Sequence, residues 1–116
     1  MLDIRTEHAD DHVVCRPVGE LDAFTVSQFR EALATLASHP RLIIDMSAVP
    51  FVDSAGLGAL IGGIRRAREL GGDVAVVCNR APLNRLLSTT GFDRIVTVAE
   101  TVGEAVASLE APSPTT

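Results

Sequence analysis

The sequence contains no lysine, tryptophan or tyrosine, and each absence excludes a class of function. All ten basic residues are arginine, so neither a lysine Schiff base nor the lysine of a P-loop can form. With four phenylalanines as its only large aromatic residues, the chain lacks the stacking surfaces that single-stranded nucleic acids need. Its net charge of −5 also argues against a nucleic-acid partner, which requires basic patches.

Long apolar runs and clustered cysteines are missing as well. No run reaches the roughly 18 apolar residues of a membrane span, and the first residues lack the apolar segment of a signal peptide, so we expect a cytoplasmic protein. Cys15 and Cys78 are far apart in sequence, and each falls in an apolar, strand-like run. We expect both to be reduced thiols in the core rather than metal ligands, and the sequence indicates no metal or other cofactor.

Apolar periodicity divides the chain into alternating strands and helices. A length of 116 residues fits one domain, predicted over 1–110, and the Pro-, Ser- and Thr-rich residues 111–116 are predicted to be a disordered tail. The predicted strands are 2–7, 12–18, 41–46, 73–78 and 95–98. The predicted helices follow polar residues near 25, 53, 80 and 101, and they end before His39, Gly71 and Gly91 and at Leu109. This pattern predicts an α/β domain whose mixed sheet has an opening hairpin, a parallel centre and about four helices.

Residues 49–60 are the stretch around which the chain is organised. They follow a nearly continuous apolar strand, and after the polar pair Asp53–Ser54 they enter a helix with an apolar face: Leu57, Leu60, Ile61 and Ile64. Asp and Ser are typical of helix starts because their oxygens accept hydrogen bonds from free backbone N–H groups. A second polar segment, Glu20–Asp22, follows the preceding strand, and in such folds sites form where strands end and helices begin.

An enzyme with its own active site fits these residues poorly. A hydrolase serine on a strand-to-helix turn needs glycine two residues earlier, where this chain has Val52, and a histidine later in the chain, whereas all three histidines precede Ser54. A dinucleotide fingerprint needs a third glycine where Ile61 stands. A serine that only caps its helix is the remaining structural alternative.

The motif Asp53–Gly58, together with the strand Ile43–Ser47 and the upstream Gly19–Asp22, resembles the STAS domains of bacterial anti-sigma factor antagonists. The resemblance runs in order and spacing over residues 2–109. It implies that Ser54 accepts a phosphate from an anti-sigma factor that is itself a serine kinase and binds the ATP. The unphosphorylated form would bind that factor, which then releases its sigma factor. The implied partner-binding residues are Asp22, Asp53, Ser54, Gly56 and Leu57. Relatives often carry Ser or Thr after the acceptor; here Ala55 leaves a single acceptor at this turn.

The resemblance therefore predicts a regulatory binding protein that is not an enzyme and touches neither nucleic acid nor membrane. A phosphate adds about −1.5 to −2 charges, so the expected switch is a change of surface charge beside Asp53 rather than a change of fold. The sequence leaves the oligomeric state open between a monomer and a weak dimer. The alternative is a non-switching STAS scaffold subunit of a larger signalling or transport assembly.

Four further expectations concern individual residues. Thr25 and Gln28 have the spacing of a capping box. Phe51 is expected to be in the core. Gly62–Gly63 would serve either close packing against the sheet or a flat helix face for a partner. Three arginines of the same helix are expected to face solvent, with contact to an acidic partner as the alternative: Arg65, Arg66 and Arg68.

Overall fold

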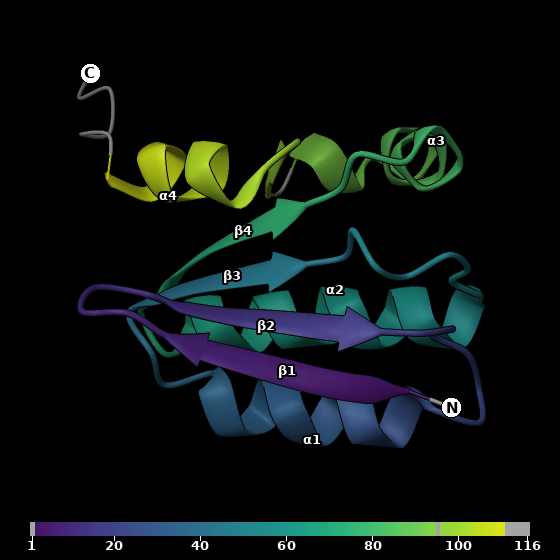
Figure 1. Ribbon diagram of the computed structural model, residues 1–116, viewed down its shortest axis with the longest axis horizontal. Coiled ribbons are helices and arrows are strands. Elements are labelled where there is room, and N and C mark those ends of the chain that lie inside the picture. Colours follow the sequence, from purple (N-terminus) through teal and green to yellow (C-terminus); the bar gives the residue numbers. More distant parts are fainter. Residues whose placement is uncertain (1, 95, 111–116) are drawn as a thin grey trace.

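One mixed sheet forms the centre of the fold, with its strands side by side in sequence order (Figure 1). The strands are β1 (Asp3–His8), β2 (Val13–Val18), β3 (Arg41–Asp45), β4 (Asp73–Val77) and β5 (Thr97–Ala99). The computed structural model describes residues 2–94 and 96–110. Within these ranges the helices are α1 (Val26–Leu36), α2 (Ser54–Glu69), α3 (Ala81–Thr89) and α4 (Val102–Glu110), with a short 3₁₀ turn, η1 (Phe92–Arg94).

Strand directions confirm the predicted mixed sheet. β1 pairs antiparallel with β2 as a hairpin, and every later neighbour pairs parallel. The parallel pairs follow from the helices between them, since a parallel connection needs a crossover. β5 begins at Thr97 rather than at residue 95, because η1 takes up part of the connection; Ile95 itself lies outside the described residues. The predicted tail, 111–116, also lies outside them.

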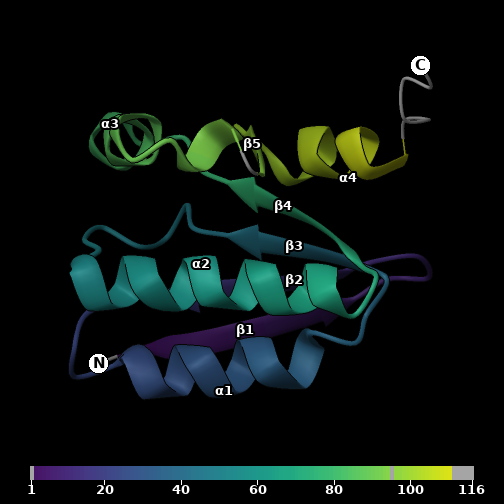
Figure 2. The ribbon, with the colours of Figure 1, turned by 180° about the vertical axis from the view of Figure 1, so that it is seen from behind.

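The two faces of the sheet carry different helices. α1 and α2 lie side by side on one face (Figure 2), where they cover alternate strand residues such as Leu42, Ile44 and Val76. α4 packs on the other face, and Ala105 joins a smaller cluster there with residues of four strands: Val14, Ile43, Ala75, Val77 and Ala99. This alternation is the two-residue period of a strand, and it explains why the central strands read as continuous apolar runs.

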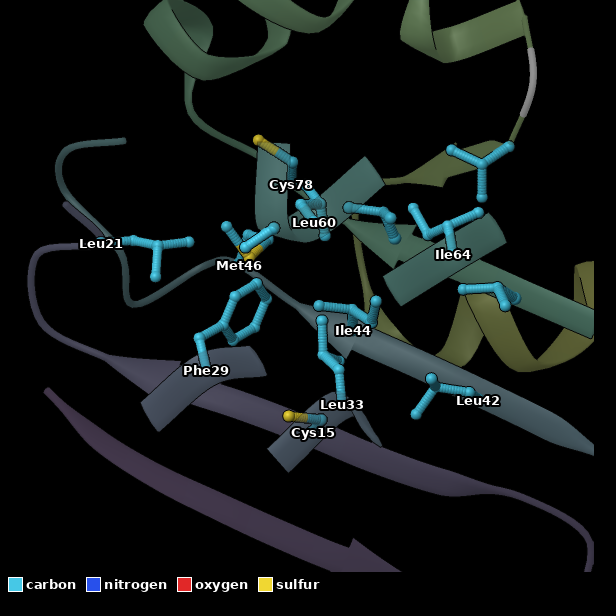
Figure 3. Close-up of a cluster of buried hydrophobic side chains, with 14 of the residues drawn as sticks. Cys15, Leu21, Phe29, Leu33, Leu42, Ile44, Met46, Leu60, Ile64 and Cys78 are labelled. Atoms are coloured by element: carbon cyan, nitrogen blue, oxygen red, sulfur yellow. The ribbon is translucent and has the colours of Figure 1, made fainter. Parts of the chain in front are cut away.

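The main core lies between the sheet and the two helices. Figure 3 shows Phe29 and Leu33 from α1 and Leu60 and Ile64 from α2 reaching the strands, and all four are buried. Burying such a side chain stabilises the fold by about 1.5–3 kcal/mol, so these spaced apolar residues fix which face of each helix meets the sheet. No helix of the part that the structure describes is both long and apolar enough to cross a bilayer.

Gly63 permits the close approach of α1 and α2. A Cβ built at Gly63 would lie 2.5 Å from Cδ1 of Leu33 on α1, whereas one built at Gly62 would meet nothing within 4 Å. The close packing expected for this pair is therefore confined to Gly63 and is made against a helix, not against the sheet. The three arginines farther along α2, expected to face solvent, are exposed.

The predicted capping box at the start of α1 is wrong. The Thr25 side chain caps no N–H of the helix; its hydroxyl donates to the Glu20 carbonyl at 2.9 Å and accepts from the Asp22 N–H at 3.1 Å. Asp22 prevents the box, because its own carboxylate takes the N–H groups of Phe24 and Thr25 and folds the chain into a tight turn before the helix.

Both cysteines are buried free thiols, as expected. Burial disfavours the charged thiolate, and it raises the pKa of Cys15 to about 11 and that of Cys78 in the same direction.

We therefore expect the native protein to resist iodoacetamide at pH 8, because only the thiolate reacts and neither sulfur is accessible. Intact mass after labelling should show no added group in buffer and two in urea. A fast single modification of the native protein would contradict the burial of at least one thiol.

Candidate functional site

Two loops leave the sheet at the carboxyl ends of β2 and β3 and reach the starts of α1 and α2. They are residues 19–25 and residues 46–53, hereafter the first loop and the second loop. α3 begins at the same edge, so three helices start there (Figure 1). Parallel strands bring their carboxyl ends together, which is why the two polar segments noted in the sequence become neighbours.

The two loops are joined by backbone hydrogen bonds. The Leu21 N–H donates to the Phe51 carbonyl at 2.9 Å, and the Asp53 N–H donates to the Leu21 carbonyl at 3.1 Å. Leu21 also forms a parallel bridge with Val52, and its side chain is fully buried. The loops are therefore a short continuation of the sheet rather than free connections, a feature that no sequence period signals.

Asp53 is the N-cap of α2 and also ties the two loops together. One carboxylate oxygen accepts from the Gly56 N–H at 2.9 Å, and the other accepts from the Ala23 N–H at 3.1 Å. Its extended backbone is the usual N-cap conformation. A negative charge at this position is stabilised by the helix dipole, so Asp53 fixes the helix start and brings the first loop beside it.

Ser54 is the first residue of α2 and is exposed. It is not the cap, so the alternative that assigns it only a capping role is wrong; Asp53 has that role. Within the described residues no hydrogen bond involves the Ser54 hydroxyl. The N–H groups of Ser54 and Ala55 have no intrahelical acceptor, since the first N–H groups of a helix never do. An accessible hydroxyl therefore lies beside free donors on a rigid helix start.

Asp22 lies on the first loop, where its carboxylate stabilises the turn into α1. One of its oxygens accepts from the N–H groups of Phe24 at 2.9 Å and Thr25 at 3.1 Å, which shapes the turn into α1. Because the Ala23 N–H donates to the Asp53 carboxylate, the loop that carries Asp22 is held beside Asp53, which Ser54 directly follows in the chain.

Gly56 and Leu57 lie on the inner side of the first turn of α2. Gly56 is buried, and a Cβ built there would lie 2.6 Å from the Leu21 carbonyl oxygen. Leu57 is partly buried against the main core. Gly56 thus allows the first loop to approach the helix, and the partner contact expected of these two residues stays a prediction.

A matched pair of glycine substitutions tests this close approach. Gly56→Ala should lower the free energy of unfolding by about 1–2 kcal/mol, because strain of about 1–3 kcal/mol exceeds the gain in helix propensity. Gly62→Ala, in the same helix but with open space, should raise it by about 0.5–1 kcal/mol. Urea denaturation compares the two; equal stabilisation by both would show that the loop does not press on the helix.

The surface around Ser54 is acidic and, in part, aromatic. The two loops carry Glu20, Asp22 and Asp53 and no basic residue. Phe24 is 94% exposed and Phe51 is 52% exposed, so the expected core position of Phe51 is wrong. Phe51 turns outward because its carbonyl and the adjoining Val52 are committed to pairing with Leu21. The role of Phe24 at this surface could not be predicted from the sequence, since the residue lies outside the apolar stripe of α1.

The second loop is anchored at its base by charged groups. The Asp45 carboxylate, buried at the end of β3, accepts from Arg16 Nε at 2.9 Å and from the Ser47 N–H at 3.0 Å. Burial alone would raise the pKa of Asp45, but the hydrogen bonds from Ser47 and Arg16 outweigh it and the pKa is lowered. Arg80, at the start of α3, donates to the Ser47 carbonyl at 3.1 Å. The loop is therefore held from both sides.

Comparison with known families identifies this arrangement. The family model of the STAS domain matches residues 3–105, almost the whole described chain. The chain belongs to the STAS domain family. The match to this STAS domain covers 98% of one relative and 96% of one solved structure.

Two relatives and one solved structure are named as anti-sigma factor antagonists. The chain is 28% identical over 115 residues to the anti-sigma F factor antagonist of Paenibacillus polymyxa, covering 97% of this chain and 98% of the relative. It is 29% identical over 100 residues to the anti-sigma-B factor antagonist of Listeria monocytogenes, covering 84% and 88%. The crystal structure of an anti-sigma factor antagonist from Mycobacterium paratuberculosis superimposes with a TM-score of 0.88 at 26% identity, covering 96% of each chain.

Proposed function

We propose that this STAS domain is an anti-sigma factor antagonist switched by phosphorylation of Ser54. In its unphosphorylated form it binds an anti-sigma factor with serine kinase activity in the cytoplasm, and that factor then releases its sigma factor. The names of the relatives support the first half of this proposal. The observation that carries the switch is the exposed Ser54 hydroxyl on the first residue of α2.

The geometry around Ser54 suits a kinase substrate. A kinase must reach the hydroxyl without unfolding the chain, and α2 continues with Gly58 and Gly62, one and two turns beyond it on the same face. A Cβ at either glycine would meet nothing within 4 Å, so no side chain shields the acceptor from that direction. The chain itself offers no lysine or glycine-rich phosphate loop, which supports a partner that binds the ATP.

The same position suits a switch by charge. A phosphate on Ser54 lies at a helix N-terminus, where dipole and free N–H groups favour an anion, so the fold tolerates it. The group still adds about two negative charges beside Asp53 and Asp22, on loops without a basic residue. A partner surface fitted to a neutral hydroxyl then meets repulsion and a charge without a counterion, and it dissociates.

Affinity capture followed by reconstitution tests the proposal. Wild type and Ser54→Ala serve as baits in the source cell, and mass spectrometry identifies an ATP-binding partner. The purified partner with ATP should then add one phosphate to the wild type, mapped to Ser54, and none to Ser54→Ala. Ser38→Ala is the matched control, because Ser38 is exposed beyond the far end of α1. Phosphorylation of Ser54→Ala at the wild-type rate would refute the assignment.

A further inference from the structure

Two of the four phenylalanines lie on the surface at the site. Among the described residues only three large apolar side chains are strongly exposed: Phe24 at 94%, Phe51 at 52% and Leu70 at 57%. Leu70 follows the far end of α2, whereas Phe24 and Phe51 lie on the first and second loops. The other two phenylalanines, Phe29 and Phe92, are fully buried in the core. Exposure of two rings on the loops that flank Ser54 therefore calls for a function.

Both rings are carried by fixed backbone. The Phe24 N–H donates to the Asp22 carboxylate at 2.9 Å. The N–H of the preceding residue, Ala23, donates to the Asp53 carboxylate. The Phe51 carbonyl accepts from the Leu21 N–H at 2.9 Å. The hydrogen bonds that join the loops thus also set the separation of the two aromatic residues. Rigid aromatic side chains bind with little loss of conformational entropy, which is why they are common anchors of interfaces.

Phe51 also borders an apolar hollow between the second loop and the start of α3. Its volume is about 110 Å³, and the residues that line it all have apolar side chains: Val49, Pro50, Phe51, Val52, Pro82, Leu83 and Leu86. That volume is several times the roughly 30 Å³ that a water molecule occupies in the liquid, so one aliphatic side chain fits. The hollow is open at the surface beside Phe51, where a partner side chain can enter it.

We propose that Phe24 and Phe51 are the apolar anchors on which the anti-sigma factor docks, one on each loop flanking Ser54. This inference rests on the proposed function and names its contact surface. The occupant is a protein surface with an aliphatic residue for the hollow and basic residues for the carboxylates. Charge complementarity requires the basic residues, because the loops carry Glu20, Asp22 and Asp53 and no cation.

The proposal explains why a phosphate at Ser54 acts strongly. Rim charges of an interface stay hydrated and have little effect, whereas a charge enclosed by apolar contacts loses its water. Anchors on both loops place Ser54 inside the contact rather than at its edge. The acceptor then lies where an added charge is most costly for binding.

The test measures binding of the purified anti-sigma factor to four variants by calorimetry. Phe24→Ala and Phe51→Ala should each weaken binding by about thirtyfold or more, the loss typical of interface hot spots. Leu70→Ala, the matched control for removing an exposed apolar side chain, should bind within twofold of the wild type. Melting temperatures check folding, and Phe24→Tyr, which keeps the ring, should bind like the wild type.

The outcomes separate this inference from the proposed function. Wild-type affinity in both Phe→Ala variants, with binding lost in Ser54→Asp, overturns the anchors and leaves the switch. Weak binding by the Phe→Ala variants, with unchanged binding by Ser54→Asp, supports the anchors and overturns the switch. No binding of the wild type to any anti-sigma factor overturns both. A wild-type dimer that both Phe→Ala substitutions dissociate would make a second copy the occupant and overturn the inference.

Discussion

Ser54→Asp should bind the anti-sigma factor about thirtyfold to several-thousandfold more weakly than the wild type, while Ser54→Ala binds with unchanged affinity. An unpaired charge left in an interface costs about 2–5 kcal/mol, which corresponds to that range. The alanine variant keeps the neutral surface and loses only a hydroxyl for which the described structure records no hydrogen bond. Titration calorimetry with the purified partner gives both affinities directly.

Neither substitution should disturb the fold. Asp53 caps α2, so Ser54→Ala removes no cap and should change the free energy of unfolding by less than about 0.5 kcal/mol. Ser54→Asp adds an anion in the first helical turn, where it should stabilise by about 0.3–1 kcal/mol. A lower affinity of Ser54→Asp together with equal or higher stability therefore reports on the interface alone.

Ser38→Asp supplies the control for net charge. It adds the same charge on an exposed serine beyond the far end of α1, and it should bind like the wild type. Equal affinities for wild type, Ser54→Ala and Ser54→Asp would mean that Ser54 does not face the partner. The non-switching scaffold subunit would then be the better description of this STAS domain.

The helices and strands could largely be predicted from the sequence, because their apolar residues recur with a regular period. The apolar stripe of α1 and the continuous apolar runs of β3 and β4 predict which side chains enter the core, because a helix or strand turns at a fixed angle per residue. The same regularity led to the mixed sheet and to Asp53–Ser54 at a helix start. A single sequence therefore predicts the periodic segments and the capping residues at their ends.

Loop geometry could not be obtained in this way. Phe51 faces solvent because the second loop pairs with Leu21, a contact across some thirty residues that no local pattern records. Thr25 fails as a cap because its hydroxyl is already bonded to the Glu20 carbonyl and the Asp22 N–H, and sequence spacing alone does not show those bonds. Gly63 packs on Leu33, which depends on how close two helices approach. The misses at Phe51 and Gly63 are tertiary contacts that override a local preference, whereas the miss at Thr25 is a competition among local hydrogen bonds.

The ion pair at the base of the second loop gives the second large prediction. Arg16→Met should lower the free energy of unfolding at pH 7 by about 2–3 kcal/mol, less than the 3–5 kcal/mol of a fully buried pair. The discount reflects exposure, since the Asp45 side chain is 4% exposed but that of Arg16 is 29% exposed. Arg5→Met is the matched control: Arg5 pairs with Asp3 on the open surface, so its loss should cost at most about 0.5 kcal/mol.

The effect should depend on pH with a definite sign. The pKa of Asp45 is lower in the folded state than the value of about 3.9 expected when unfolded. Its contribution is therefore complete above that value and is lost as the pH falls through the folded-state pKa. The cost of Arg16→Met should be largest near pH 7 and shrink below pH 4, because a protonated Asp45 no longer attracts the guanidinium.

A double-mutant cycle with Asp45→Asn isolates the pair from other changes at Arg16, which also bonds to Glu7 at 3.1 Å. In the Asp45→Asn background, Arg16→Met should cost at least about 1 kcal/mol less than in the wild type, a coupling expected for residues in direct contact. Urea denaturation of the four proteins at pH 7 supplies the cycle. If the coupling is zero and Arg16→Met costs no more than Arg5→Met, the pair does not hold the base of the loop. The backbone bonds of Ser47 and Leu21 would then be what positions Ser54.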